Sequence, residues 1–306
     1  MIDDEAFEFS LSKLQELCPD QSKSIHGPQS LTWKVFRYSC CLWGGLRAAL
    51  LQIALPQVAQ AIKDHSQIIA NPYERLKRTF FFVSQANYGP QSLAIDTARR
   101  LRSYHSNIHG YMPDGSRYFA NDETAVFWVH ASIAETGILM YEKLKKPLTL
   151  KEKDQLINEL YKSALLMGLH KRELHESWNS FNEQYQFIKK NLLYRIDATN
   201  EIAQVLVKPH IPYGTLMNYL IAFTVSSLDQ DVLSLFDLEG SPEKSRRLLY
   251  LLRKSYSFLP EILQWMPPYM EVHYSHSRYK LRQPFISLAN KLMLGQRSII
   301  RSQLKS

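Results

Sequence analysis

The chain has 306 residues, of which 45% are hydrophobic and 22% charged, and this composition excludes a disordered protein. Its formal net charge is +8, so an anionic cofactor, an anionic membrane surface or nucleic acid would each suit its charge. The basic residues are dispersed and lack the aromatic interleaving of RNA-binding sheets, so nucleic acid is not an expected partner.

Cysteine usage and the chain start indicate a cytoplasmic protein. Three cysteines are too few for a disulfide framework and have no zinc-binding spacing. The first ten residues, MIDDEAFEFS, are acidic and lack the apolar segment of a signal peptide. No apolar run reaches the roughly 18–20 residues of a transmembrane helix.

Hydrophobic periodicity is helical along almost the whole chain, and no strand is predicted. From Trp33 to Lys63 a Leu- and Ala-rich stretch is interrupted at Gly44, Gly45 and Pro56, which predicts helices separated by a bend. The two glycines are expected to allow close helix packing rather than to bind phosphate.

The sequence NPYERLKRTFFF, residues 71–82, contains a helix start. Pro72 suits the first helical position, Asn71 is expected to cap free N–H groups with its side chain, and Glu74 can reach back to the cap. This helix is predicted over 72–88 and ends before Gly89 and Pro90.

The remaining helices follow in chain order. One is expected at 92–108, and a loop with turn residues at 113–115 precedes another at 122–143. The helix at 122–143 is apolar on almost all sides and is therefore predicted to be buried in a large fold. Further helices are expected at 149–169, 177–194, 196–207, 213–228, 242–256 and 275–303. The predicted fold class is all-α, a single domain of many helices.

Arg75 and Thr79 stand four residues apart on the predicted helix 72–88, beside an apolar stripe of Leu76, Phe80 and Val83. This spacing puts a guanidinium and a hydroxyl at the edge of the core, where they could face a buried ligand. The alternative is a solvated arginine whose aliphatic stem covers apolar surface.

His105 lies on an apolar stripe of the helix 92–108, flanked by Arg102. It is either a satisfied core histidine or a metal or haem ligand. His109 stands four residues on, at the spacing of a two-histidine zinc site, but no third ligand is evident. The other members of the stripe are Ala94, Ala98, Leu101 and Ile108.

His130 is the second candidate histidine, in the sequence WVHASIAE of the buried helix. Its helical neighbours are apolar, and a buried imidazole must find a hydrogen-bond partner or a metal. His130 is therefore expected to be a ligand or to support one by donating to a carbonyl.

Seven motifs stand in a characteristic order along the chain: TWKV (32–35), GGLRAALLQIALP (44–56), KDHS (63–66), NPYERLKRT (71–79), RRLRSYHSNIHG (99–110), GSRYFANDETAVFWVHASIAETGILMYE (115–142) and PLT (147–149). Taken together, they resemble the MpaB-like oxygenase domain that bacterial rubber oxygenases (latex clearing proteins) share with a fungal enzyme that shortens a prenyl side chain. The resemblance covers about residues 30–230.

The resemblance implies an all-α fold with a globin-like core, and a b-type haem whose iron is bound by a proximal histidine. By position, Arg75 and Thr79 match distal residues, and His105 matches the proximal ligand, with His130 as second choice. Arg78 stands where these relatives keep a lysine, and arginine does not replace lysine in role because it is bulkier and stays protonated. Haem also needs cations beside its propionates, for which Arg102, with Arg75, Arg99 and Arg117, is a candidate.

These observations lead to one hypothesis and one alternative. The hypothesis is a haem-dependent oxygenase that uses dioxygen on a hydrophobic, prenylated or unsaturated small molecule, with Arg75 and Thr79 polarising oxygen or positioning substrate. The alternative is a non-catalytic all-α haem- or lipid-binding protein. The domain organisation expected is an arm at 1–29, the oxygenase domain at 30–230 and a helical extension at 231–306 packed on the same domain. Peripheral membrane contact is a further candidate, through 258–270 and the basic tail 291–305.

Overall fold

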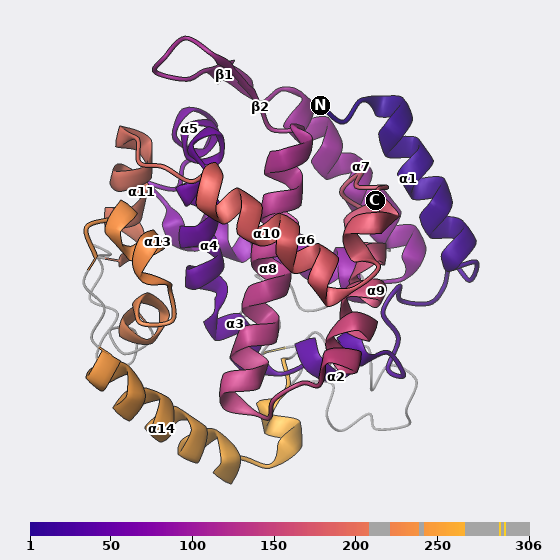
Figure 1. Ribbon diagram of the computed structural model, residues 1–306. Coiled ribbons are helices and arrows are strands. Elements are labelled where there is room, and N and C mark those ends of the chain that lie inside the picture. The colour runs from indigo at the N-terminus through magenta and orange to yellow at the C-terminus, as the bar shows by residue number, and fades with distance from the viewer. Residues whose placement is uncertain (208–220, 239–241, 267–287, 289–290, 292–306) are drawn as a thin grey trace.

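The computed structural model describes residues 1–207, 221–238, 242–266, 288 and 291, and this part of the chain is a helical domain (Figure 1). The predicted all-α class is therefore confirmed. The α-helices are α1 (Asp4–Leu17), α2 (Leu31–Phe36), α3 (Ser39–Trp43), α4 (Gly45–Ala54), α5 (Pro56–His65), α6 (Pro72–Tyr88), α7 (Gln91–Ser106), α8 (Glu123–Leu144), α9 (Leu150–Leu165), α10 (Trp178–Asn191), α11 (Asp197–Val207), α13 (Gln230–Leu235) and α14 (Pro242–Phe258).

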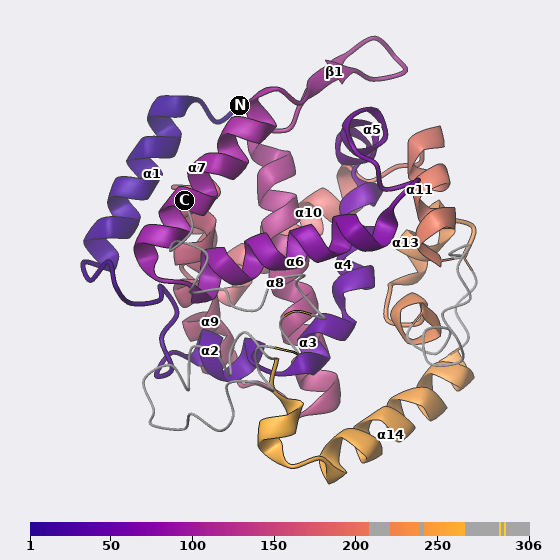
Figure 2. The same ribbon diagram turned by 180° about the vertical axis from the view of Figure 1, so that it is seen from behind.

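The helix α8 forms the centre of the domain, as its apolar sequence predicted. It packs against α3, α4 and α10, and α10 crosses it on the side opposite to α6 (Figures 1 and 2). Trp128 of α8 is fully buried, donates from Nε1 to the carbonyl oxygen of Leu51 at 2.8 Å, and stacks on Tyr185 of α10. The Asp122 side chain caps α8 by accepting from the Ala125 N–H at 3.0 Å.

Gly44 explains how the α3–α4 junction approaches α8. A Cβ atom at this position would lie 2.8 Å from Cγ of Met140 and would also overlap the side chain of Thr136. Any larger residue would push the two helices apart, which confirms the prediction of close packing for Gly44. For Gly45 the prediction is wrong, because a Cβ atom there would meet nothing within 4 Å. Pro56 begins α5 directly after the α4 helix, so the predicted bend is also confirmed.

The helix α6 begins at Pro72 and ends at Tyr88, as predicted. The expected cap by the Asn71 side chain is wrong, because that side chain makes no capping hydrogen bond. The backbone explains this, since Asn71 has ψ 65° instead of the values near 150–180° of the working caps Asp3 and Ser30. Its carbonyl oxygen does accept from the Arg75 N–H at 3.2 Å.

The segment expected to be an N-terminal arm contains the helix α1. Asp3 caps it by accepting from the Ala6 N–H at 2.8 Å. Phe7, Leu11 and Leu14 occupy one face of α1 and are buried in the main core, where α1 packs against α9. The first residues are therefore an integral part of the domain core.

The loop predicted before α8 is a small antiparallel hairpin of β1 (His109–Tyr111) and β2 (Arg117–Phe119). Gly115 adopts φ +84° in its turn, and Asp114 accepts from the Ser116 N–H at 2.9 Å, so the turn residues behave as predicted. Gly110 lies opposite Tyr118, and a Cβ atom there would come within 2.6 Å of the tyrosine hydroxyl oxygen.

The C-terminal part includes the predicted helix at 242–256, which forms α14. Of the helix predicted at 213–228, the structure describes 221–225 as helical, and the helix predicted at 275–303 lies outside the described residues. In the stretch 258–270, the described part folds back on the protein: Glu261 accepts from Arg37 at 2.7 Å, and Trp265 packs on the Arg37 guanidinium. Residues 267–270 and the basic tail lie outside the described residues, apart from Lys291.

Within the described residues, no single helix is both long and apolar enough to cross a membrane. The pair Ser39–Ala54 and Pro56–His65 meets that criterion only when taken together, and it is bent by 102°.

Candidate active site

Except for His130, which lies on α8, the predicted site residues come from α6 and α7, two helices that are consecutive in the chain. The two helices pack together beside the turn at Gly89 and Pro90 and diverge from it (Figure 2). Arg75 lies in the first turn of α6 and His105 in the last turn of α7. Both residues lie at the far ends of the two helices from this turn, yet the charge of Arg75 still contributes to lowering the pKa of His105.

The His105 imidazole is neutral at physiological pH. Its ring is half-buried, at the open end of the stripe that runs from the fully buried Ala94 and Ala98. Burial, followed by the positive charges of Arg102 and Arg75, lowers the pKa of His105 to about 4. A neutral imidazole keeps a lone pair available, which is the form that binds a metal.

Arg75 is a half-buried cation that has no carboxylate partner among the described residues. Its Nε donates to Ser66 Oγ at 3.1 Å. Burial is the main cause that lowers the pKa of Arg75, and the charge of Arg78 adds to it. The buried Arg47, by contrast, pairs with Glu135. Arg75 thus supplies positive charge that an anionic group could neutralise.

Thr79 and Arg78 lie on the exposed side of the same helix. The Thr79 hydroxyl donates to the Arg75 carbonyl oxygen at 3.0 Å, so its proton is used inside the helix while its oxygen can still accept. Arg78 is close enough for its charge to lower the pKa of Arg75. The two residues therefore flank Arg75 rather than lie deeper in the protein.

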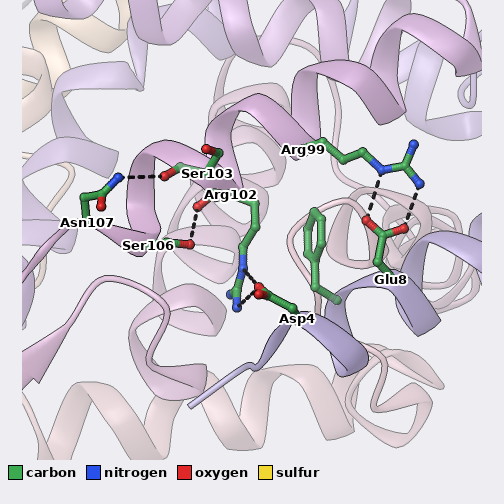
Figure 3. A pocket seen from close by; sticks show the side chains of 8 residues that line it. Asp4, Glu8, Arg99, Arg102, Ser103, Ser106 and Asn107 are labelled. Carbon is green, nitrogen blue, oxygen red and sulfur yellow. Dashed lines mark hydrogen bonds and ion pairs between the residues drawn. The ribbon is translucent and has the colours of Figure 1, made fainter.

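Arg102 is engaged elsewhere, on the face of α7 that meets α1. Its guanidinium donates to Asp4 Oδ1 at 3.0 Å and to the Ile2 carbonyl oxygen at 2.8 Å, and Arg99 pairs with Glu8 in the same way (Figure 3). These pairs line a cleft of about 450 Å³ between α1 and α7. Charged and polar walls of this kind do not suit a flat apolar ligand.

His130 lies in a separate, fully buried cluster. Its Nε2 is 3.1 Å from Nε2 of His175, in the 3₁₀ helix η1 (Arg172–His175), so one ring nitrogen carries the shared proton and the other accepts it. Burial, followed by the charges of His175 and His26, lowers the pKa of His130 well below its usual range. Phe127, Tyr161 and Phe181 surround the His175 ring. The prediction was that His130 donates to a carbonyl; the partner found in the structure is His175.

A third buried histidine, His26, lies close enough for its charge to lower the pKa of His130, and it was not predicted from sequence. Its Nε2 is 2.8 Å from Ser163 Oγ, and that hydroxyl gives its own proton to Asn87 Oδ1 at 2.6 Å. His26 Nε2 must therefore be the donor, which leaves Nδ1 unprotonated, buried and without a partner. His26 and His175 come from a loop and from a short 3₁₀ helix, where no periodicity marks them as buried.

The remaining expectation concerned zinc at His105 and His109. His109 lies on the strand β1 with an exposed ring, so the two histidines do not share a helix face. No group of three or more metal-binding side chains occurs among the described residues. The spacing of His105 and His109 therefore does not bring the two rings together on one helix face.

The fold and this site define a helical domain in which a neutral histidine feels the charge of an arginine that has no carboxylate partner among the described residues. The chain matches the family model described as ER-bound oxygenase mpaB/B'/Rubber oxygenase, catalytic domain, over residues 33–258. It belongs to this family of oxygenase catalytic domains, as the sequence motifs indicated. The match continues past residue 230 and includes α14. Searches among curated proteins and among solved structures found no match.

Proposed function

We propose that this protein is a haem-dependent oxygenase that acts on a hydrophobic, unsaturated small molecule. Family membership supports the general class, an oxygenase that takes dioxygen and a small-molecule substrate. One observation carries the more specific proposal: the half-buried imidazole of His105 is held neutral by burial and by the charges of Arg102 and Arg75, and Arg75 is a half-buried cation with no carboxylate partner among the described residues.

The chemistry of these side chains fits a b-type haem. Haem iron takes a neutral imidazole as its protein ligand, and His105 is held neutral by burial and by two nearby arginines. The haem propionates need cations or donors, and Arg75 has charge that no described carboxylate neutralises. When bound, haem would supply the activation of dioxygen, which protein side chains alone do not provide.

The side chains of the chain itself have distinct proposed tasks. His105 would hold the iron. Arg75 would supply a fixed positive charge and free guanidinium N–H donors where negative charge develops. Thr79 would accept a hydrogen bond through its oxygen, because its proton is already given to the helix backbone. Arg78 reinforces the positive potential but cannot act as the base that a lysine can become.

Two further candidates have weaker support as haem contacts. The Arg102 guanidinium is bonded by Asp4 and Ile2, so a propionate would have to compete with an existing ion pair. His130 already bonds His175, so iron at His130 would have to displace that contact. We therefore assign the ligand role to His105 and give His130 a supporting role in the core.

Spectroscopy of the purified protein tests this proposal. With haem supplied, the protein should develop a Soret band that His105→Ala loses or shifts and that His130→Ala keeps in position. Oxygen consumption with a series of prenyl lipids then separates an oxygenase from a non-catalytic haem-binding protein. Haem binding without oxygen uptake for any of these lipids would support a non-catalytic haem-binding protein.

A further inference from the structure

The helix α14 lies at the edge of the molecule in both views, with one long side turned away from the domain (Figures 1 and 2). Its inner side is anchored: Tyr256 is buried, donates to the Gln264 carbonyl oxygen at 2.8 Å and packs edge-on against Trp43. Leu248 is also buried, and α14 contacts α8. The direction of the outer side is therefore fixed by the core.

The outer face of α14 is defined here by Arg247, Tyr250, Leu251, Lys254 and Phe258. Each of these residues has another of the set three or four positions away, so together they form one stripe of the helix. Three of them are large apolar or aromatic residues that are mostly exposed: Tyr250 by 64%, Leu251 by 57% and Phe258 by 75%. A folded domain rarely leaves three such side chains in one row without a partner.

Positive charge accompanies these apolar side chains. The sequence of α14 contains five basic residues and one acidic residue, Glu243. Arg247, Arg253 and Lys254 are exposed, and they have no ion pair among the described residues. Two copies of this helix would repel each other through these charges, which argues against a dimer through α14.

We infer that the outer face of α14 docks on an anionic lipid surface. An amphipathic helix with aromatic and aliphatic residues between basic ones suits an interface where apolar groups enter the acyl boundary and cations meet phosphates. The 17-residue helix is long enough to lie along such a surface. The inference does not rest on the proposed haem chemistry, because lipid binding needs no turnover.

Vesicle co-sedimentation of the full chain tests the inference. The protein should bind phosphatidylcholine vesicles that contain phosphatidylglycerol, and bind much less to phosphatidylcholine alone. Each basic residue near an anionic surface contributes roughly fivefold in affinity, so the double variant Arg247→Glu, Lys254→Glu should bind about 25-fold less or weaker still. The variant Leu251→Ser, Phe258→Ser should also bind less, since it removes the inserting groups.

The helix α10 offers a matched control, because Phe187 and Lys190 are also exposed but lie on a different helix. The double variant Phe187→Ser, Lys190→Glu should bind vesicles as the unchanged protein does. Equal binding by the α14 and α10 variants would overturn the inference, and so would equal binding to neutral and anionic vesicles. Dimerisation in solution that the α14 variants abolish would assign the face to a second copy and overturn it as well.

The variant Phe258→Trp keeps the test independent of losses in folding. Its added indole emission should shift to shorter wavelength when anionic vesicles are added, because the side chain moves from water into the interface. The same substitution at Phe187 should give no shift. Absence of a shift at Phe258 would overturn the inference even if the vesicles sediment the protein.

Discussion

Replacing His26 by glutamine should remove one specific component of the pH dependence of stability. His26 is fully buried, and burial followed by the charge of Lys162 lowers its pKa to about 3. An unfolded histidine titrates near pH 6.5. The unfolded chain therefore takes up a proton at His26 between these two values while the folded protein does not.

The sign and the size follow from proton linkage. Because the unfolded state binds more protons in this window, His26 leaves stability intact above about pH 6.5 and lowers it as the pH falls towards 3. Between pH 7 and pH 5, one such histidine lowers the free energy of unfolding by about 1.9 kcal/mol. Glutamine at position 26 can still donate to Ser163 but cannot bind the proton.

Urea unfolding at a series of pH values measures this difference. The free energy of unfolding of the unchanged protein should fall between pH 7 and pH 5 by about 1.9 kcal/mol more than that of His26→Gln. His109→Gln, which alters an exposed histidine on β1, is the control and should keep the full dependence. Equal pH dependence in His26→Gln and the unchanged protein would refute the tautomer and burial assigned to His26.

Three further predictions concern the core, a helix end and the candidate site. Arg47 is buried, pairs with Glu135 and donates to the Ser227 carbonyl oxygen at 3.1 Å, so Arg47→Met should cost about 3–5 kcal/mol in urea unfolding; a loss under 1 kcal/mol would show that the pair is solvated. Thr149 and Glu152 form a capping box at α9, so Thr149→Ala should lower the free energy of unfolding by about 1 kcal/mol. An unchanged thermal midpoint in this variant would contradict the prediction. Arg75→Gln should lower oxygen consumption per bound haem by roughly 10²-fold, and unchanged turnover per haem would remove Arg75 from the site.

Most of the fold was predictable because the start, the end and the buried face of a helix are encoded in its local sequence. Proline at position 72 and the Gly89–Pro90 pair gave the bounds of α6, and the uninterrupted apolar sequence of 122–143 gave the burial of α8. The missed helix α1 also has such a signal, with Phe7, Leu11 and Leu14 at helical spacing, but its acidic start resembled an exposed arm. The hairpin was missed because its three-residue strands are too short to show alternation.

The candidate site was predictable only in part. The spacing of Arg75 and Thr79, and the stripe that holds His105, are local features of two helices. The ion pairs of Arg102 and the contacts of His130 with His175 depend on packing between segments far apart in the chain. Sequence patterns do not report such contacts, so the cleft beside α1 and the buried histidine cluster became visible only in three dimensions.

The visible absorption spectrum of the purified protein tests the central proposal most directly. We expect a Soret band after haem is supplied, its loss or shift in His105→Ala, and its retention in His130→Ala. A protein that shows no Soret band even with excess haem would contradict the proposal. A band that persists in His105→Ala and disappears in His130→Ala would contradict the assignment of the iron ligand to α7.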